Sequence, residues 1–272
     1  MRIVSLLPSA TDILVALGAG DDIVGVSHSC GDEWSSVPKL TSTWIDKTAS
    51  SAEIDHQVKN ATQPLYQLDI ATLEELAPDI VVSQSLCEVC AIPSGDVEDA
   101  IRSLPNQPTL IDLSPQRLDE VPLDFAIVGS HIGKQSEAKA LQEQWDETFS
   151  RCYLKYQSEA PKIAFLDWLD PPFAAGHWVP DMIEWLGASS TLAQPGQPSY
   201  QSDWGDIVSS EPDMIIAACC GFEEARASIV ATPLEIIVLD GYKYFSRPSP
   251  MLMQSIELLD LTIANHLGLN RP

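Results

Sequence analysis

The chain has 272 residues, of which 45% are hydrophobic, and this length suits two domains better than one. Its 15 basic residues stand against 39 acidic ones, which gives a formal net charge of −24. That balance argues against a nucleic-acid-binding protein and against docking on an anionic membrane, because both rely on lysine and arginine. Solubility is the simplest reading of the acidic excess. No apolar run approaches the length of a transmembrane helix, so no membrane insertion is expected.

Short apolar segments alternate with helix signals along the first part of the chain. Strands are predicted at 2–6, 22–26, 80–83 and 109–113, and helices at 9–17, 71–76 and 97–104. Ser9 precedes residues of helical spacing and is followed three positions later by Asp12, which predicts that Ser9 caps the first helix. Residues 27–67 are expected to be irregular. The alternation is typical of a parallel sheet with helices on both faces.

The middle of the chain has a different pattern. A helix is predicted at 118–132, and a longer amphipathic helix at 135–159 carries Trp145, Phe149 and Cys152 on its apolar stripe. The second half then alternates again. Its strands are predicted at 162–167, 214–218 and 236–239, and its helices at 180–186, 204–210, 223–229 and 249–267.

These patterns predict an α/β fold of two Rossmann-like lobes with parallel sheets. We expect an N-terminal lobe at 1–133, a single connecting backbone helix at 134–160 and a C-terminal lobe at 161–272. A long helix between two α/β halves would act as a rigid connector.

Most of the cysteines follow predicted strands. Loops after strands hold Cys30, Cys87, Cys90, Cys219 and Cys220, together with His28 and His177. Ligands of α/β proteins bind at the carboxyl ends of parallel strands, so these side chains would converge if both lobes face one cleft. Thiolates select zinc, copper(I) or iron–sulfur clusters, and histidine can complete such a shell. Two alternatives stay open: thiol contact with a metal-containing ligand, and simple burial of small side chains.

Catalytic motifs are missing from the sequence. It contains no GxSxG, P-loop, HExxH or GxGxxG pattern. Ser9 could hold an anion at a helix N-terminus, although capping is the simpler role. Arg247 could neutralise an acidic group of a ligand or stabilise the last helix. We therefore expect a binding protein and no enzyme.

Five segments carry a resemblance to a known family. They are 2–12 (Arg-Ile-Val-Ser-Leu-Leu-Pro-Ser-Ala-Thr-Asp), 76–82 (Leu-Ala-Pro-Asp-Ile-Val-Val), 171–176 (Pro-Pro-Phe-Ala-Ala-Gly), 211–216 (Glu-Pro-Asp-Met-Ile-Ile) and 245–250 (Phe-Ser-Arg-Pro-Ser-Pro). In this order they resemble class III substrate-binding proteins of ABC importers, most closely the cobalamin-binding group. The resemblance covers nearly the whole chain. It implies two lobes, one long backbone helix and a ligand cleft between the lobes.

The resemblance also implies a large metal-containing ligand, such as cobalamin or another corrinoid, gripped by aromatic side chains. The candidate ligand-binding residues are Ser9, Trp44, Tyr66, Trp168, Phe173, Trp178, Trp204, Phe245 and Arg247. Core packing is the alternative role for each tryptophan.

The sequence departs from this family in three respects. Its first residues show no secretory signal pattern, which predicts a cytoplasmic protein. The acidic residue that each lobe of the family uses to dock on a permease falls at Ala71 and Gly205, with Glu74, Glu75 and Asp206 close by. Family clefts are also not normally lined with cysteines. These departures put uptake and docking on an ABC permease in doubt.

Two functional hypotheses follow. The first is a cytoplasmic protein that holds a corrinoid or another metal-containing ligand in its cleft and takes no part in uptake. The alternative is a protein whose cleft builds a Cys/His-coordinated metal or iron–sulfur site, for sensing, storage or electron transfer.

Overall fold

The computed structural model describes residues 1–86, 92–222 and 235–269. It divides into two compact units. Unit 1 comprises Met1–Pro115 and Pro122–Gln142, and unit 2 comprises Gln116–Val121 and Glu143–Pro272. Each unit has its own sheet and its own core, as the alternating pattern predicts.

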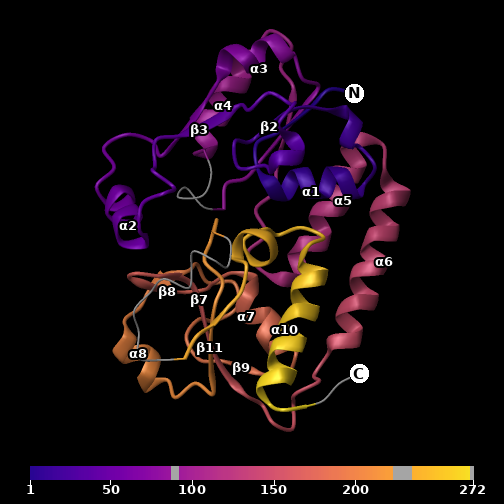
Figure 1. The fold of residues 1–272 in the computed structure, drawn as a ribbon. Coiled ribbons are helices and arrows are strands. Elements are labelled where there is room, and N and C mark those ends of the chain that lie inside the picture. Colours follow the sequence, from indigo (N-terminus) through magenta and orange to yellow (C-terminus); the bar gives the residue numbers. More distant parts are fainter. Residues whose placement is uncertain (87–91, 223–234, 270–272) are drawn as a thin grey trace. The chain divides into compact units, whose positions relative to one another are not determined.

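Unit 1 is built on a four-stranded parallel sheet (Figure 1). Its strands, in the spatial order β2-β1-β5-β6, are β2 (Ile23–Val26), β1 (Ile3–Ser5), β5 (Ile80–Ser83) and β6 (Thr109–Asp112). All neighbouring strands pair in parallel. The predicted parallel sheet is therefore confirmed in this unit. Its helices are α1 (Pro8–Ala16), α2 (Ser51–Lys59), α3 (Ile70–Leu76), α4 (Ser94–Ser103) and α5 (Val121–Ile132).

Helix α1 begins one residue earlier than its predicted cap. Pro8 occupies the first turn, the N-cap is Leu7, and no side chain caps the helix. Proline suits this position because its ring fixes φ and its missing N–H would be unpaired there. The capping prediction for Ser9 is therefore wrong, and its side chain is buried in the first turn. The helix ends before Gly18, whose φ of +72° gives the left-handed turn that terminates it.

Residues 27–67 are more regular than predicted. They contain a two-stranded antiparallel ribbon of β3 (Thr41–Thr43) and β4 (Tyr66–Leu68), besides helix α2. A capping box starts α2, in which Ser50 accepts from the backbone N–H of Glu53 and Glu53 accepts in return from Ser50.

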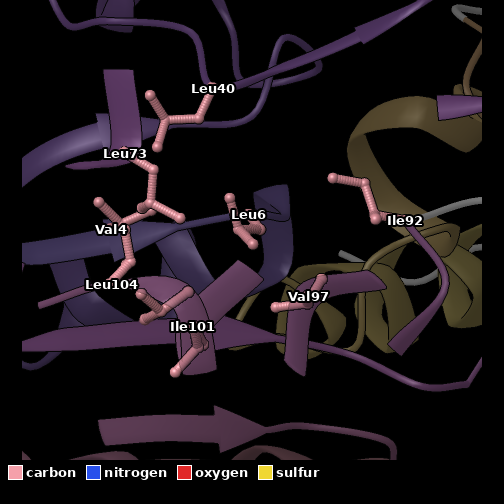
Figure 2. Close-up of a cluster of buried hydrophobic side chains, with 9 residues drawn as sticks. Val4, Leu6, Leu40, Leu73, Ile92, Val97, Ile101 and Leu104 are labelled. Atoms are coloured by element: carbon pink, nitrogen blue, oxygen red, sulfur yellow. The ribbon is translucent and has the colours of Figure 1, made fainter. Parts of the chain in front are cut away.

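The core of unit 1 is an aliphatic cluster that joins the sheet to its helices. Its members, drawn as sticks in Figure 2, are Val4, Leu6, Leu40, Leu73, Val81, Ile92, Val97, Ile101 and Leu104. Val4, Leu40, Leu73, Val81 and Val97 are fully buried. Burying one such side chain stabilises a fold by about 1.5–3 kcal/mol, so this cluster is a main source of stability for the unit.

Unit 2 contains a mixed sheet. Its main path runs β10 (Tyr200–Gln201), β8 (Pro172–Ala174), β7 (Lys162–Leu169), β11 (Met214–Ala217) and β12 (Ile237–Val238), and β9 (Ser189–Ser190) pairs with β7. The strands β7, β9, β11 and β12 pair in parallel as expected. Strand β8 runs antiparallel to β7 and β10, because a tight turn at residues 170–171 sends the chain straight back. The expectation of a purely parallel sheet is wrong here.

Among the described residues, the helices of this unit include α7 (Trp178–Trp185), α8 (Trp204–Ser209), the π-helix η4 (Gly241–Phe245) and α10 (Leu252–His266). The helix predicted at 223–229 lies outside the described residues. The segment Gln116–Val121 is fastened to α7, because Arg117 forms an ion pair with Asp181 at 2.5 Å and the Leu118 N–H donates to the same carboxylate at 3.1 Å.

Helix α6 (Gln135–Cys152) starts where predicted and ends earlier than predicted. Leu154 and Ala160 have φ values of 49° and 41°, a left-handed conformation that a helix cannot contain. Tertiary hydrogen bonds hold this bend, since the backbone N–H groups of Leu154 and Tyr156 donate to Trp185 and Leu186, each at 2.8 Å. Within the described residues, no helix has the length and apolar character needed to cross a membrane.

Candidate functional site

The loop after β2 places a hydrogen-bonded histidine at the carboxyl edge of the unit 1 sheet. The Nδ1 atom of His28 lies 2.6 Å from the Thr41 hydroxyl, which also accepts from the His28 backbone N–H at 2.9 Å. Its Nε2 atom lies 3.2 Å from the Ser29 hydroxyl. A neutral ring satisfies both contacts, because one of its nitrogens donates and the other accepts. The ribbon β3–β4 thus fixes the orientation of the imidazole.

Burial and two lysines keep the His28 ring neutral. Desolvation is the main cause that lowers the pKa of His28 to about 4, and the positive charges of Lys47 and Lys39 contribute to the same shift. The ring of Tyr66 lies 5.7 Å from the imidazole, measured between ring centroids, at an interplanar angle of 33°. The sequence analysis selected both Tyr66 and His28 as site residues. In the structure their rings lie side by side in unit 1.

Two other candidate residues of unit 1, Cys30 and Trp44, contact different parts of the unit. Cys30 is buried, and its sulfur lies 3.3 Å from the Thr11 hydroxyl, which donates to Ser5. Trp44 is 37% exposed and donates from Nε1 to the Pro64 carbonyl at 3.0 Å. Cys87 and Cys90 lie outside the described residues.

The carboxyl ends of β7 and β11 bring two aromatic rings together in unit 2. Trp168, near the end of β7, lies 5.1 Å from Phe222, which follows β11, in a tilted arrangement of 53°. Both rings pack partly on the apolar cluster of the sheet and are partly exposed. The Trp168 Nε1 atom donates to the Asp170 carbonyl at 3.2 Å, which orients the indole.

The adjacent cysteines after β11 differ in environment. Cys219 is 3% exposed, and burial raises the pKa of its thiol to about 12, with the charge of Asp167 acting in the same direction. Cys220 is partly exposed, and its backbone N–H donates to the Asp167 carbonyl at 2.8 Å. A thiol with so high a pKa is protonated at neutral pH.

No metal site is formed by the part of the chain that the structure describes, in which no group of three or more His, Cys, Asp or Glu side chains could hold an ion. His177 begins α7 and contacts the Gln116 side chain at 3.2 Å through Nδ1, and burial lowers its pKa. Coordination by the predicted Cys/His set stays a prediction, because two of its members are outside the described residues.

A π-helix follows β12 and carries basic and aromatic side chains. The guanidinium carbon of Arg247 lies 4.2 Å from the centroid of the Tyr242 ring, and the Lys243 ammonium lies 4.8 Å from that of Tyr244. Such cation–π contacts hold long side chains in place. The chain approaches β11 closely here, since a Cβ atom on Gly241 would lie 2.2 Å from the Cys219 carbonyl oxygen.

Two of the predicted ligand residues of unit 2 are core residues in the structure. Phe245 packs on Phe165 with 5.0 Å between centroids, and its carbonyl accepts from Trp178 Nε1 at 3.0 Å. Both Phe245 and Trp178 are buried, so the core-packing alternative applies to them. Phe173 on β8 and Trp204 at the start of α8 are partly exposed.

Several site residues escaped the sequence analysis. Thr41, Lys39 and Lys47 act on His28 from positions 11 to 19 residues away, and polar residues in an irregular segment gave no pattern that would select them. Phe222 and Tyr242 lie in the segments that follow β11 and β12, so the same positional argument used for Trp168 could have found them.

The comparisons with known proteins agree with this architecture. The sequence profile of the periplasmic binding protein family matches residues 3–234. This chain belongs to that family. The vitamin B12-binding protein of Vibrio cholerae serotype O1 is 21% identical over 266 residues, which cover 94% of this chain and 86% of the relative.

Solved structures of the same fold include binding proteins for two kinds of ligand. The vitamin B12 binding protein BtuF of Vibrio cholerae superposes with a TM-score of 0.66 at 18% identity, covering 98% of this chain and 97% of that one. A periplasmic heme binding protein from Pseudomonas aeruginosa superposes with a TM-score of 0.73 at 16% identity, covering 100% and 94%. The likeness confirms the α/β fold and the family resemblance read from the sequence.

Family membership decides two of the earlier expectations. The chain belongs to a family of binding proteins, as expected. The relatives named above are binding proteins and not enzymes. The expectation of a cytoplasmic protein is contradicted, because the family and its B12-binding relatives are periplasmic or extracellular solute-binding proteins. The comparisons also give no support to the expectation that the protein takes no part in uptake.

Proposed function

We propose that the ligand of this binding protein is a flat metal-containing macrocycle, either a corrinoid or a heme-like tetrapyrrole. The observation that carries this proposal is the pair of aromatic rings of Trp168 and Phe222 at the carboxyl ends of β7 and β11. Strand ends are where α/β folds bind ligands, and partly exposed aromatic rings offer a flat macrocycle a large apolar contact.

The loop after β2 offers a second set of suitable groups. The Tyr66 ring beside His28 provides another aromatic face, and the neutral imidazole is the form of histidine that can contact a metal centre. The named ligands of the relatives, vitamin B12 and heme, are both metal-containing macrocycles. The iron–sulfur and zinc alternatives have no comparable support from any relative.

Delivery of this ligand to an ABC permease is the role that we propose for the protein. Ala71 and Gly205 stand at the positions that the family resemblance assigns to docking acids, and both are exposed. Exposed carboxylates lie within a few residues of each, namely Glu74, Glu75 and Asp206. These carboxylates are the groups that could meet basic side chains of a permease.

The ligand class is tested by titrating the purified protein with cyanocobalamin and with hemin while following tryptophan fluorescence and the visible spectrum. We expect saturable binding of one of them, with quenching from Trp168. The variants Trp168→Leu and Phe222→Leu should each weaken that binding by about tenfold, since an aromatic contact contributes about 1–2 kcal/mol.

Tyr153→Leu is the matched control. Tyr153 is 56% exposed and lies in the segment before the amino end of β7, away from the aromatic pair. Its loss should leave the affinity unchanged. Absence of binding for both macrocycles, or equal losses in all three variants, would contradict the proposed ligand class.

A further inference from the structure

Two lysines converge on the loop that follows β2. Lys39 is half-buried, and its ammonium donates to the Cys30 carbonyl at 3.0 Å. Lys47 reaches the same loop from beyond β3 and donates to the Ser29 hydroxyl at 3.3 Å. Ser29 also contacts the His28 ring at 3.2 Å, so one short loop holds two cations and a hydroxyl close together.

The Lys39 ammonium has a backbone carbonyl as a hydrogen-bond partner. Some other basic side chains of unit 1 form ion pairs on the surface, such as Lys59 with Asp55 at 2.8 Å and Arg102 with Glu98 at 2.6 Å. The Lys39 ammonium forms no ion pair with a carboxylate of the described residues, although the chain carries a net charge of −24. The protein is rich in carboxylates, yet none of those in the described residues forms an ion pair with the half-buried Lys39 ammonium.

The two ammonium groups raise the local positive potential at the loop. Both lower the pKa of His28, which shows that their fields reach the same ring. A half-buried cation that is paired only with neutral acceptors is best stabilised by an anion, which can accept charge-assisted hydrogen bonds.

We propose that Lys39 and Lys47 form a subsite for an anionic group of the ligand, a carboxylate or a phosphate. The subsite rests on the proposed function for the identity of the whole ligand, and its chemistry is independent of which macrocycle binds. A tetrapyrrole would present a propionate carboxylate there, and cobalamin would present its phosphodiester. Local cations of this kind allow a strongly acidic protein to accept an acidic ligand.

The first test compares ligands with and without the anionic group. Hemin is compared with hemin dimethyl ester, and aquacobalamin with aquacobinamide, which lacks the phosphodiester together with the ribose and base attached to it. Lys39→Gln and Lys47→Gln should each weaken binding of the member that carries the anionic group by about tenfold and leave binding of the member that lacks it unchanged. Lys59→Gln, which removes an ion-paired lysine of the same unit, should change neither. Equal losses for both members of a pair, or no loss in Lys39→Gln, would overturn the subsite.

A second test separates the subsite from the proposed function. If wild-type protein binds neither macrocycle, the proposed function fails, and inorganic phosphate then decides the subsite. At constant ionic strength, phosphate should raise the melting temperature of wild type and Lys59→Gln more than that of Lys39→Gln or Lys47→Gln. Equal shifts in all four proteins would overturn the subsite.

Discussion

The imidazole of His28 is uncharged in the folded protein at pH values where an unfolded chain would protonate it. Its pKa is about 4 in the folded state against 6.5 for an unperturbed histidine. Between these values the unfolded chain binds more protons than the folded one, so the free energy of unfolding falls as the pH drops. Protonation would also turn both ring nitrogens into donors and so remove the hydrogen bond that one of them accepts.

We therefore expect His28 to make the protein acid-sensitive. Wild type should lose about 2 kcal/mol of stability from this group between neutral pH and pH 4, after allowance for solvent screening of a half-buried ring. His28→Gln removes the titrating group and should flatten that part of the profile. Urea unfolding at several pH values measures the difference, and parallel profiles for the two proteins would contradict the expectation.

Gly241 is required by its contact with the neighbouring strand. A Cβ atom there would lie 2.2 Å from the Cys219 carbonyl oxygen and 2.4 Å from the Ala218 carbonyl carbon, and backbone atoms cannot give way as a side chain can. Gly241→Ala should destabilise the protein by at least about 2 kcal/mol.

Gly95→Ala provides the comparison for this prediction. Gly95 lies in α4, and nothing stands within 4 Å of the added methyl group. This change should stabilise the protein by about 0.5–1 kcal/mol, because alanine favours a helix. Thermal unfolding of both variants tests the pair, and similar effects of the two substitutions would argue against the close approach at Gly241.

At the scale of elements, a buried tyrosine anchors the segment between α6 and β7. The Tyr156 hydroxyl contacts both the backbone carbonyl and the carboxylate of Asp260 in α10, at 2.8 Å and 2.7 Å. Lys155 forms an ion pair with the same carboxylate. These contacts hold the left-handed bend after α6 against the last helix.

Tyr156→Phe should lower the free energy of unfolding by about 1.5–3 kcal/mol, because the lost bond is made to a charged group. Tyr153→Phe is the matched change three residues earlier, at a side chain that is 56% exposed, and it should cost little. Chemical denaturation of both variants compares them, and equal stabilities would show that the Asp260 contact contributes nothing.

An element could be predicted from the sequence where its own residues show the pattern of the structure that it forms. Residues 80–83 could be predicted as a strand because β5 is buried along its whole length and begins with the apolar run Ile80-Val81-Val82. The ribbon strands β3 and β4 are short and carry polar residues, so their pairing is visible only in three dimensions. The end of α6 is set by bonds to Trp185 and Leu186, which no local pattern reveals.

The sequence analysis selected the loops of the candidate site but missed several of the side chains that they carry. The rule that ligands meet the carboxyl ends of strands selected Trp168 and His28, which the structure places beside Phe222 and Tyr66. The same rule selected Cys30, whose sulfur instead contacts the Thr11 hydroxyl in the interior. Loop position alone does not say which way a small side chain turns.

For the whole molecule, binding and stability are linked. A macrocycle present at about 100 times its dissociation constant should raise the free energy of unfolding by about 2.7 kcal/mol, because it binds only the folded state. At the same macrocycle concentration, the free energy of unfolding of Trp168→Leu should rise by less, because the variant binds the macrocycle more weakly. Denaturant unfolding with and without cyanocobalamin or hemin measures the gain, and an unchanged midpoint at saturation would refute specific binding to the native state.

The placement of Gln116–Val121 bears on how such proteins evolve. This stretch belongs to unit 2, although the chain on either side of it belongs to unit 1, and its Arg117 holds the Asp181 carboxylate of α7. A recombination event that replaced everything after residue 142 would import a new α7 and leave the old partner of its carboxylate upstream. The two units therefore cannot be exchanged at a single crossover after residue 142 without separating this ion pair.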